Sequence, residues 1–235
     1  MHRFFADEKG IQNGLAFLDS ADSHHALKVL RMNVGDEAEL IANGALYRCR
    51  IISDAVSVQV LEALPSPEPK LKITLYQGLP KADKMDFIVQ KATELGVIKI
   101  VPVAMARCVL KLDDKDGRKK QERWQKIARE AAKQAGRALV PEITPPQPLK
   151  KTVFNEKLLL VPWEEAADYG LRAFHMAHPH AESIGILIGP EGGITSEEIN
   201  SLPFTPVTLG KRILRTETAG LCALSALYAL YGDLE

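Results

Sequence analysis

A proline-rich segment divides this sequence into two parts with different residue patterns. Residues 64–69 contain three prolines within five positions, Pro65, Pro67 and Pro69. Proline fixes φ and lacks an amide donor, so such a segment favours extended backbone. We therefore predict a boundary here, with one domain over residues 1–66 and a second over residues 70–235. The chain of 235 residues is long enough for this division.

The first part is rich in strand signals. Residues 36–42 and 45–53 are strand candidates, and Asn43-Gly44 between them is a strong signal for a tight hairpin turn. A third run follows, in which alternate positions are valine: Val56, Val58 and Val60. We expect one helix in this part, around residues 23–31. A short meander of strands in a unit of this size predicts a small β-barrel.

The second part alternates short apolar runs with helical patterns. We predict strands over residues 73–77, 98–103, 157–161 and 183–188, and helices over residues 84–95, 121–137 and 219–231. Gly96 directly follows the first of these helices and is a typical helix stop. Strands that alternate with helices predict an α/β domain with a largely parallel sheet covered on both faces.

The composition bounds the class of protein. There are 30 lysines and arginines and 30 aspartates and glutamates, so the formal net charge is zero. This balance argues against a protein that coats nucleic acid through its overall charge, but not against a local basic surface. The three cysteines, Cys49, Cys108 and Cys222, form no CxxC pair, which favours a reducing cytoplasm. The first five residues lack the apolar core of a signal peptide. Residues 219–231 are shorter than the ~20 residues of a membrane span, so we expect a cytoplasmic protein without a membrane segment.

Two glycine-bearing loops carry the strongest functional signal. Residues 189–193 follow the apolar run 184–188, and residues 208–218 come about one structural element later. Glycine lets backbone approach a ligand closely, and ligands of α/β sheets bind beyond the carboxyl ends of strands. The spacing matches neither the dinucleotide-binding GxGxxG pattern nor the phosphate loop GxxxxGK(S/T). We interpret the loops as two walls of one cofactor pocket. The alternative for the first loop is a tight turn into a helix capped by Thr195 or Ser196.

Four segments, taken in order, resemble the SPOUT methyltransferases, and within them the family that methylates N3 of a uridine in 16S ribosomal RNA. They are His24-His-Ala-Leu-Lys-Val-Leu-Arg31 with Val34-Gly-Asp36, Lys91-Ala-Thr-Glu-Leu-Gly96, Leu187-Ile-Gly-Pro-Glu-Gly-Gly-Ile194, and Thr208-Leu-Gly-Lys-Arg-Ile-Leu-Arg-Thr-Glu-Thr-Ala-Gly220. The resemblance covers essentially the whole chain. It implies an N-terminal PUA-like RNA-binding β-barrel and a C-terminal α/β domain with a trefoil knot, in which the two glycine-bearing loops are the loops of the knot.

The resemblance also implies S-adenosylmethionine as the cofactor, held in a bent conformation. Nine residues of the two loops are then expected to bind it: Gly189, Pro190, Glu191, Gly192, Gly193, Leu209, Gly210, Ile213 and Leu214. Arg215 is the expected catalytic residue, because a guanidinium can stabilise the anion that forms when uridine N3 loses its proton. The alternative is a structural ion pair between Arg215 and Glu217 or Glu191. The general base is open between Glu217 and bulk water.

Residues 115–137 contain nine basic and three acidic residues. On a helix at ~100° per residue, one face carries Lys126, Arg129, Lys133 and Arg137, and the opposite face carries Trp124, Ile127, Ala131 and Ala135. A solvated helix face is the alternative to a phosphate contact. With 16S ribosomal RNA in the small ribosomal subunit as the partner, the expected RNA-binding residues are Arg3, His25, Lys28, Arg31, Lys126, Arg129 and Lys133.

The C-terminal helical pattern is apolar nearly all round, which predicts a buried helix with Cys222 in the core and with Thr216 or Thr218 as its cap. The resemblance places this helix in the knot and across a homodimer interface, and an ordinary core helix is the alternative. His175, His178 and His180 favour a surface loop, because no cysteine or placed carboxylate accompanies them, so no metal is expected.

Two other functions are compatible with these patterns. One is methylation of a ribose 2′-hydroxyl, the other main chemistry of knotted methyltransferases. The second is a non-catalytic RNA-binding protein that assists ribosome assembly and retains an inert knot. The glycines at positions 192 and 193 and Arg215 argue against the inert version.

Overall fold

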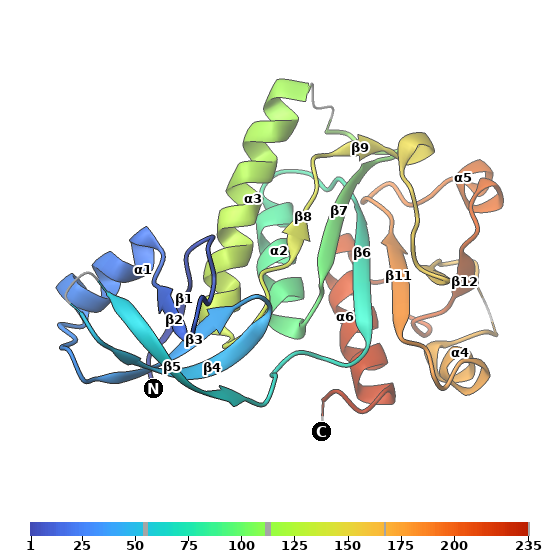
Figure 1. The fold of residues 1–235 in the computed structure, drawn as a ribbon. Helices are drawn as coiled ribbons and strands as arrows, with labels where there is room; N and C mark the ends of the chain where they lie inside the picture. The colour runs from blue at the N-terminus through green and yellow to red at the C-terminus, as the bar shows by residue number, and fades with distance from the viewer. Residues whose placement is uncertain (54–55, 111–113, 167, 235) are drawn as a thin grey trace. The chain divides into compact units, whose positions relative to one another are not determined.

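The computed structural model describes residues 1–53, 56–110, 114–166 and 168–234. The chain divides into two compact units (Figure 1). The first comprises Met1–Glu68 and Ala132–Leu139, and the second comprises Pro69–Ala131 and Val140–Glu235. The first break therefore falls inside the proline-rich segment, whereas the inclusion of Ala132–Leu139 in the first unit has no counterpart in the sequence pattern.

The first unit is built on a five-stranded sheet in the order β1-β3-β4-β5-β2. Its strands and helical segments are β1 (Arg3–Phe5), β2 (Leu15–Phe17), α1 (Ser20–His24), a π-helical turn (His25–Val29), β3 (Glu37–Ala42), β4 (Ala45–Ile51) and β5 (Ser57–Leu64). An isolated antiparallel bridge between Ala6 and Leu18 joins the ends of the two edge strands. The Asp19 amide also donates to the Phe5 carbonyl at 3.0 Å, so the sheet curls until its edges meet.

The hairpin between β3 and β4 has the predicted turn. Asn43 and Gly44 have φ angles of 53° and 74°, as the two central residues of a type I′ turn require. The helix expected around residues 23–31 begins earlier, at Ser20, because the carboxylate of Asp19 accepts the Asp22 amide at 2.8 Å and caps it. The helical backbone ends before Arg31, whose φ is 53°.

The second unit is a seven-stranded, entirely parallel sheet with helices on both faces. The strand order is β12-β10-β11-β6-β7-β8, and β9 also pairs with β7. The elements are β6 (Lys72–Gly78), α2 (Lys84–Leu95), β7 (Lys99–Ala104), α3 (Asp114–Gln134), β8 (Glu142–Ile143), β9 (Gln147–Pro148), a 3-10 turn (Leu149–Lys151), β10 (Leu158–Pro162), α4 (Leu171–Ala177), β11 (Ser183–Ile188), α5 (Ser196–Ser201), β12 (Thr205–Val207) and α6 (Thr216–Leu230).

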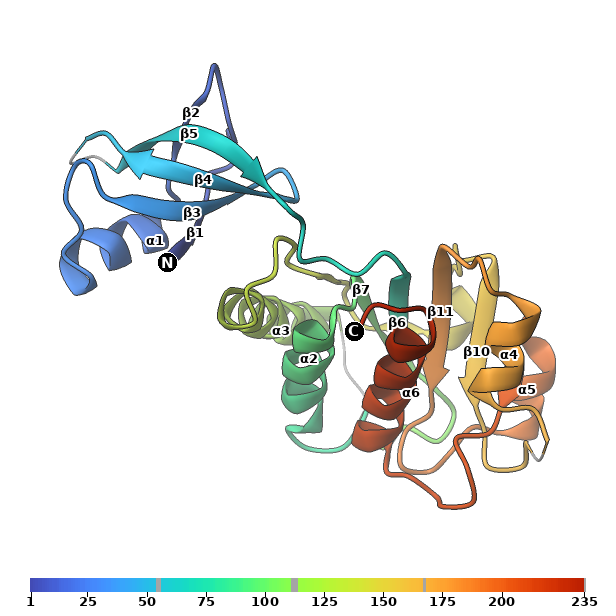
Figure 2. The ribbon, with the colours of Figure 1, turned by 90° about the horizontal axis from the view of Figure 1, so that it is seen from below.

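Successive strand residues point to opposite faces of this sheet and fill two separate cores. On β11, Ile184, Ile186 and Ile188 enter the core that contains α2, α4 and α6, while Leu187 enters the core on the other face, which includes residues of α5. Figure 2 shows α2, α6 and α4 side by side on one face of the sheet. Burial on both faces explains why the strands read as continuous apolar runs, as parallel sheets require.

The order of the last strands brings the end of the chain back across the sheet. β10 lies between β11 and β12, and α6, which follows β12, packs against α2, α4, β6 and β11. This crossing is the arrangement expected of the SPOUT resemblance, and the trefoil knot itself stays a prediction. In the described part of the chain, each helix is too short or too polar to span a bilayer.

The end of α3 corrects the prediction for the basic helix. The helix was expected to reach Arg137 but ends at Gln134, and Gly136 has a left-handed φ of 71°. Arg137 therefore leaves the exposed face. Its side chain is 4% exposed and pairs with Glu68 at 2.5 Å, whereas Ala135 is exposed. The predicted strands and the helix α2, by contrast, lie within a few residues of where the sequence places them, and α2 ends on Gly96 with φ 113°. The short strands β1, β2, β8, β9 and β12 were not predicted.

We expect Gly96→Ala to destabilise the second unit strongly. Any Cβ at this left-handed position costs about 1 kcal/mol, and here it would also lie 2.5 Å from Cγ of Pro69, which adds about 1–3 kcal/mol of overpacking. Urea unfolding monitored by tryptophan fluorescence measures the loss, because Trp124 and Trp163 both lie in the second unit. Gly232→Ala is the matched control, since Gly232 has φ 75° with nothing within 4 Å. Equal losses in both variants would contradict the packing argument.

Candidate active site

Three loops meet at one edge of the sheet in the second unit. β10 pairs in parallel with β11 on one side and with β12 on the other, so the carboxyl ends of all three strands lie together. The loops that leave these ends are residues 163–166, 189–195 and 208–215. The carboxyl edge of a parallel sheet is where α/β folds bind ligands. The two glycine-bearing loops predicted to share one pocket are thus brought together, with a third loop after β10.

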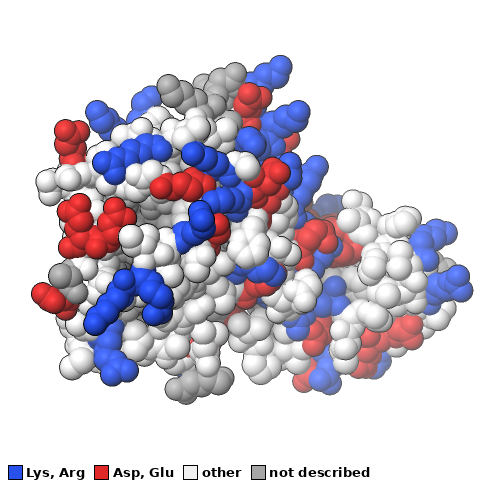
Figure 3. Space-filling view, turned by 180° about the vertical axis from the view of Figure 1, so that it is seen from behind, with Lys and Arg blue, Asp and Glu red and all other residues white. Residues whose placement is uncertain are grey.

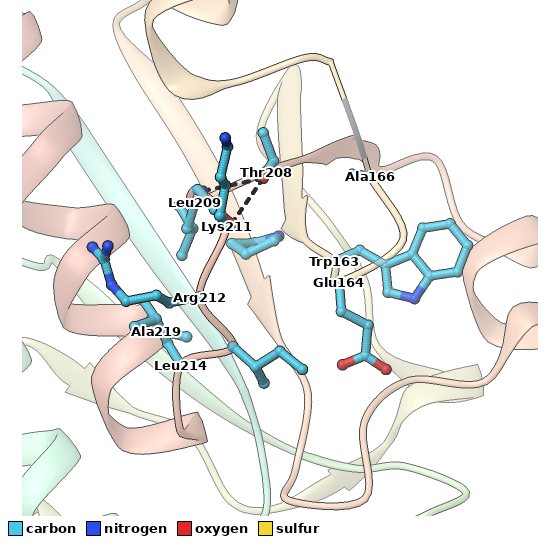
Figure 4. Close-up of a pocket in the computed structure, with 12 residues that line it drawn as sticks. Trp163, Glu164, Ala166, Thr208, Leu209, Lys211, Arg212, Leu214 and Ala219 are labelled. Carbon is cyan, nitrogen blue, oxygen red and sulfur yellow. Dashed lines mark hydrogen bonds between the residues drawn. The ribbon is translucent and has the colours of Figure 1, made fainter.

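Two adjoining cavities of about 360 and 380 Å³ open between these loops. Leu209 and Gly210 line the first cavity (Figure 4), while Gly189, Pro190, Glu191 and Gly193 line the second. The residues common to both are Pro162, Trp163, Glu164, Ile213, Leu214 and Ala219. Of the nine expected cofactor-binding residues, only Gly192 lines neither. Together the cavities have the size of a typical small-molecule site.

Glycine is needed at positions 192 and 193 of the first loop for two different structural reasons. Gly193 adopts φ 75°, which a β-branched residue strongly disfavours. Gly192 instead packs against the loop after β7, where an added Cβ would lie 2.8 Å from Cβ of Arg107. Arg107 Nη1 also donates to the Gly192 carbonyl at 3.0 Å. The close approach at Gly192 is therefore made by Arg107, a residue that sequence reasoning did not identify.

The turn after this loop is fixed by the predicted helix cap. The Thr195 hydroxyl accepts the Glu198 amide at 3.1 Å, and the Glu198 carboxylate accepts the Thr195 amide at 3.0 Å, which together form a capping box at the start of α5. Glu198 also accepts the Ala106 amide at 2.8 Å. The loop after β7 is therefore joined to the loop after β11 at Gly192 and to α5 at Glu198.

The start of α6 differs from the prediction. Thr216 and Thr218 were expected as caps, but the cap position is Arg215, which has extended backbone and no capping side-chain hydrogen bond. The Thr216 hydroxyl is used elsewhere: it donates to the Gly189 carbonyl at 2.6 Å and accepts from Nε2 of Gln77 at 2.9 Å. Gln77 is fully buried at the end of β6. These bonds connect β6, the glycine loop and α6 beneath the cavity.

Lys84, at the first residue of α2, holds the two carboxylates that were considered as partners for Arg215. Its Nζ lies 3.0 Å from Glu191 Oε1 and 3.1 Å from Glu217 Oε2. Among the described residues, no carboxylate forms an ion pair with Arg215, which is exposed and lines the second cavity. Arg215 therefore makes no close ion pair with Glu191 or Glu217, although its charge contributes to the lowered pKa of Glu217, and its exposed guanidinium is accessible to a ligand.

The same ammonium shifts the pKa values of this group. Partial burial raises the pKa of Glu191, but the hydrogen bond from Lys84 and the backbone amides outweigh it and leave that pKa below its ordinary value. Burial likewise raises the pKa of Glu217, which its own amide and Lys84 bring below the ordinary value. Hydrogen bonds to Glu191 and then Glu217 raise the pKa of Lys84. A carboxylate with a lowered pKa is a weaker base, which disfavours Glu217 as the general base.

The expected RNA-binding residues fall into three groups: ion-paired, half-buried and exposed. Arg3 and Lys133 are held in ion pairs, Arg3 with Glu39 at 2.5 Å and Lys133 with the buried carboxylate of Asp22 at 2.5 Å. Arg129 is half-buried, and the exposed residues are His25, Lys28, Arg31 and Lys126. On the face seen in Figure 3, lysine and arginine side chains are interspersed with aspartate and glutamate.

Two smaller expectations change with the structure. Cys222 is exposed on α6 and is not in the core. His175 lies in the last turn of α4, not in a loop, and its ring packs edge-on against Tyr231 with centroids 4.5 Å apart. Among the described residues, no group of three or more histidines, cysteines or acidic residues is arranged to hold a metal ion.

Comparison with known families agrees with this geometry. Residues 67–228 match the model of an RNA methyltransferase domain, and residues 18–61 match that of an RNA methyltransferase PUA domain. The chain belongs to this RNA methyltransferase family. A ribosomal RNA small subunit methyltransferase E from Bacillus subtilis is 39% identical to it, over 97% of this chain and 96% of that protein.

Solved structures give the same result. A ribosomal RNA small subunit methyltransferase E from Neisseria gonorrhoeae, solved with S-adenosylmethionine, has a TM-score of 0.82 and 33% identity and covers all of both chains. A methyltransferase from Legionella pneumophila, also solved with bound S-adenosylmethionine, has a TM-score of 0.79 and 32% identity, over 97% of this chain and 96% of that one.

We expect Lys84→Met to lower the midpoint of thermal unfolding near neutral pH, because it leaves Glu191 and Glu217 without their cation. Carboxylates with lowered pKa values stabilise the fold above their ordinary pKa, and this contribution is lost as pH falls through the lowered values. Because the pKa of Lys84 is raised, its ammonium stabilises the fold at pH values below the ordinary lysine pKa. That contribution is lost as pH rises through the raised pKa. The difference in unfolding midpoint between Lys84→Met and wild type should therefore be largest between about pH 5 and pH 10 and should shrink at pH 3.

Lys91→Met is the matched control for this prediction, since it removes the same charge from the same helix. Lys91 pairs only locally, with Glu94 at 2.8 Å. Differential scanning fluorimetry across the pH range should show a smaller effect for this control. A pH-independent loss in Lys84→Met would contradict the electrostatic account.

Proposed function

We propose that this chain transfers a methyl group from S-adenosylmethionine to N3 of a uridine in 16S ribosomal RNA of the small ribosomal subunit. The observation that carries the proposal is Arg215, a guanidinium without an ion-pair partner among the described residues, at a cavity built from the loops after β10, β11 and β12. Relatives that are solved with S-adenosylmethionine, and named for methylating small-subunit ribosomal RNA, support the assignment.

The cavity lining suits this cofactor. Leu209, Ile213 and Leu214 offer an apolar wall for the adenine, and the backbone of Gly189 and Gly193 borders the second cavity. When bound, the cofactor supplies a methyl group already activated by its sulfonium, so the remaining chemistry is to create a nucleophile. Two solved relatives hold the same cofactor, and the eight loop residues that line the cavities are proposed to bind it here. Gly192 leaves the set, because Arg107 occupies the space beside it.

Uridine N3 carries a proton and gains a free lone pair only after losing it. The resulting negative charge spreads onto O2 and O4 of the base. Arg215 would donate hydrogen bonds to one of these oxygens and stabilise the anion by about 3 kcal/mol, as an oxyanion donor does. Because Lys84 already engages Glu217, we assign removal of the proton to solvent and not to that carboxylate.

The RNA must present an unpaired or flipped-out uridine, since N3 lies on the pairing edge of the base. We propose His25, Lys28, Arg31, Lys126 and Arg129 as residues that contact the RNA backbone. Arg3 and Lys133 leave this set, because Glu39 and Asp22 neutralise them. The PUA domain match over residues 18–61 includes the first three of the retained residues. A ribosomal substrate also implies that the protein acts in the cytoplasm.

We further propose that the enzyme is a homodimer joined through α6 and that the returning chain is knotted. The outer face of α6 carries small or apolar side chains without a lysine or arginine, including Thr218, Leu221, Cys222, Ser225 and Ala229. Such a surface favours burial against a partner. Light scattering at micromolar concentration should give twice the 25.9 kDa of one chain, and Cys222→Arg should lower it. A wild-type mass of 25.9 kDa would contradict the dimer.

Mass spectrometry of nucleosides tests the reaction. Small-subunit RNA incubated with the protein and S-adenosylmethionine should yield N3-methyluridine. A ribose-methylated nucleoside would identify the 2′-hydroxyl reaction instead. Absence of any methylated nucleoside on both free RNA and assembled subunits would favour a non-catalytic RNA-binding protein.

Arg215→Ala and Gly193→Val should separate chemistry from binding. If Arg215 acts on the uridine anion, its loss should lower kcat by about 100-fold with little change in cofactor Kd, whereas lysine should restore part of the rate. Higher pH should partly rescue Arg215→Ala, because more of the base is then deprotonated in solvent.

Gly193→Val should instead weaken cofactor binding, since valine strongly disfavours φ 75°. Titration calorimetry and single-turnover kinetics make the comparison, with Arg172→Ala, an exposed arginine on α4, as the control. Loss of cofactor binding with a normal kcat in Arg215→Ala would move Arg215 from chemistry to the cavity wall.

A further inference from the structure

Some of the charged side chains around the two cavities have an ion-pair partner of opposite charge in the described part of the chain, and others do not. These charged side chains are Glu164, Glu191, Lys211, Arg212 and Arg215. Lys84 and the Lys81 amide neutralise Glu191. Among the described residues, no lysine, arginine or histidine lies within ion-pair distance of Glu164, although this carboxylate lines both cavities. Glu164 is therefore the uncompensated negative charge of the site.

The backbone fixes Glu164 at the junction of the loops. It is the second residue after β10, and the amide of its neighbour Trp163 donates to the Val207 carbonyl at 3.1 Å, which joins this loop to β12. The Ala166 amide closes a turn onto Trp163 at 3.1 Å. Glu164 Oε1 lies 3.7 Å from the place that a Cβ on Gly193 would occupy, so the carboxylate borders the glycine loop as well. Figure 4 shows its side chain extending into the open space between the loops.

Arg107 also borders Gly193, but it is already engaged. Its Nη1 lies 3.5 Å from that same Cβ position and donates to the Gly192 carbonyl. Glu164 is exposed at the mouth of the cavities, where its carboxylate attracts a cationic ligand group.

The position of Glu164 indicates which cationic group of the cofactor it contacts. In the proposed function, the adenine lies on the apolar wall of the first cavity, Arg215 lines the second, and residues of both cavities bind the cofactor. The cofactor atom that joins adenosine to the transferred methyl then lies where the cavities meet. That atom is the sulfonium. We propose, on the basis of that function, that Glu164 binds the sulfonium charge of S-adenosylmethionine and so positions the methyl group toward the second cavity.

Methyl transfer removes the charge that Glu164 binds. It breaks the bond between sulfur and the methyl carbon, the electron pair of that bond stays on sulfur, and the sulfonium becomes a neutral thioether. The attraction to Glu164 is then lost, so the carboxylate favours S-adenosylmethionine over the product S-adenosylhomocysteine. Both molecules carry the same amino-acid ammonium and differ only at the sulfur and its methyl group.

Titration calorimetry with both ligands tests the inference in three variants. Glu164→Gln should weaken the binding of S-adenosylmethionine about fivefold and the binding of S-adenosylhomocysteine less than twofold. This is the size expected of one partly solvated charge contact. Glu164→Asp, which keeps the charge, should recover part of the difference. Glu165→Gln is the matched control, because Glu165 is the exposed neighbour that lines neither cavity. Thermal unfolding of each variant checks that the fold is intact.

Each other outcome overturns the inference. An equal loss for both ligands in Glu164→Gln would place the carboxylate at the ammonium or make it a structural residue. No change for either ligand would remove it from the site. A wild-type protein that binds neither ligand would refute the proposed function itself, and this is measured before any variant is made.

Discussion

The site depends on the hydroxyl of Thr216. It donates to the Gly189 carbonyl at 2.6 Å and accepts from the fully buried Gln77 amide at 2.9 Å. Three elements far apart in the sequence, β6, the loop after β11 and the start of α6, therefore share one small group of hydrogen bonds. A buried amide that lost this partner would cost about 1–3 kcal/mol. The bonds fix Arg215, the residue before Thr216, at the edge of the cavity, so its position is a result of buried packing and not of local loop structure.

Electrostatic interactions complete this arrangement. One ammonium, that of Lys84, satisfies two carboxylates at 3.0 and 3.1 Å, on the glycine loop and on the first turn of α6. Because Lys84 engages both acids near Arg215, Arg215 on one wall and Glu164 on another form no close ion pair within the described protein. A cationic cofactor and a base that develops negative charge fit such a pair of walls. Lys84 and Arg215 thus have separate roles, structural and functional, although their side chains carry the same charge.

The parts of the fold that the sequence predicts are those set by local rules. Gly96 ends α2 where a left-handed residue is needed, Asn43-Gly44 makes the hairpin, and the apolar run over residues 183–188 coincides with β11. Eight of the nine loop residues expected from the resemblance line the two adjoining cavities, because parallel strands bring their carboxyl ends together. The end of α3 was misplaced because the helical pattern continues past Gln134, while Arg137 is held by a tertiary contact with Glu68.

What the sequence does not predict lies in long-range contacts. Arg107 and Gly192 are 85 positions apart, and Gln77 and Thr216 are 139 apart, so no spacing or periodicity relates them. Lys84 is unremarkable as a residue at the start of a helix, and its role emerges only when α2 and α6 pack together. The Thr216 side chain was assigned to a local cap for the same reason, since a cap is the only partner that neighbouring residues suggest.

The strand order has a consequence for how the protein is made. Every residue that lines the two cavities lies between positions 162 and 219, and the wall after β12 is held in place by α6, the last helix. During synthesis, the earlier strands β6 and β7 can pair long before any pocket exists. A nascent chain therefore cannot build the binding site for its methyl donor until translation has delivered α6. Ligand would then protect from proteolysis only those molecules in which α6 has joined the fold.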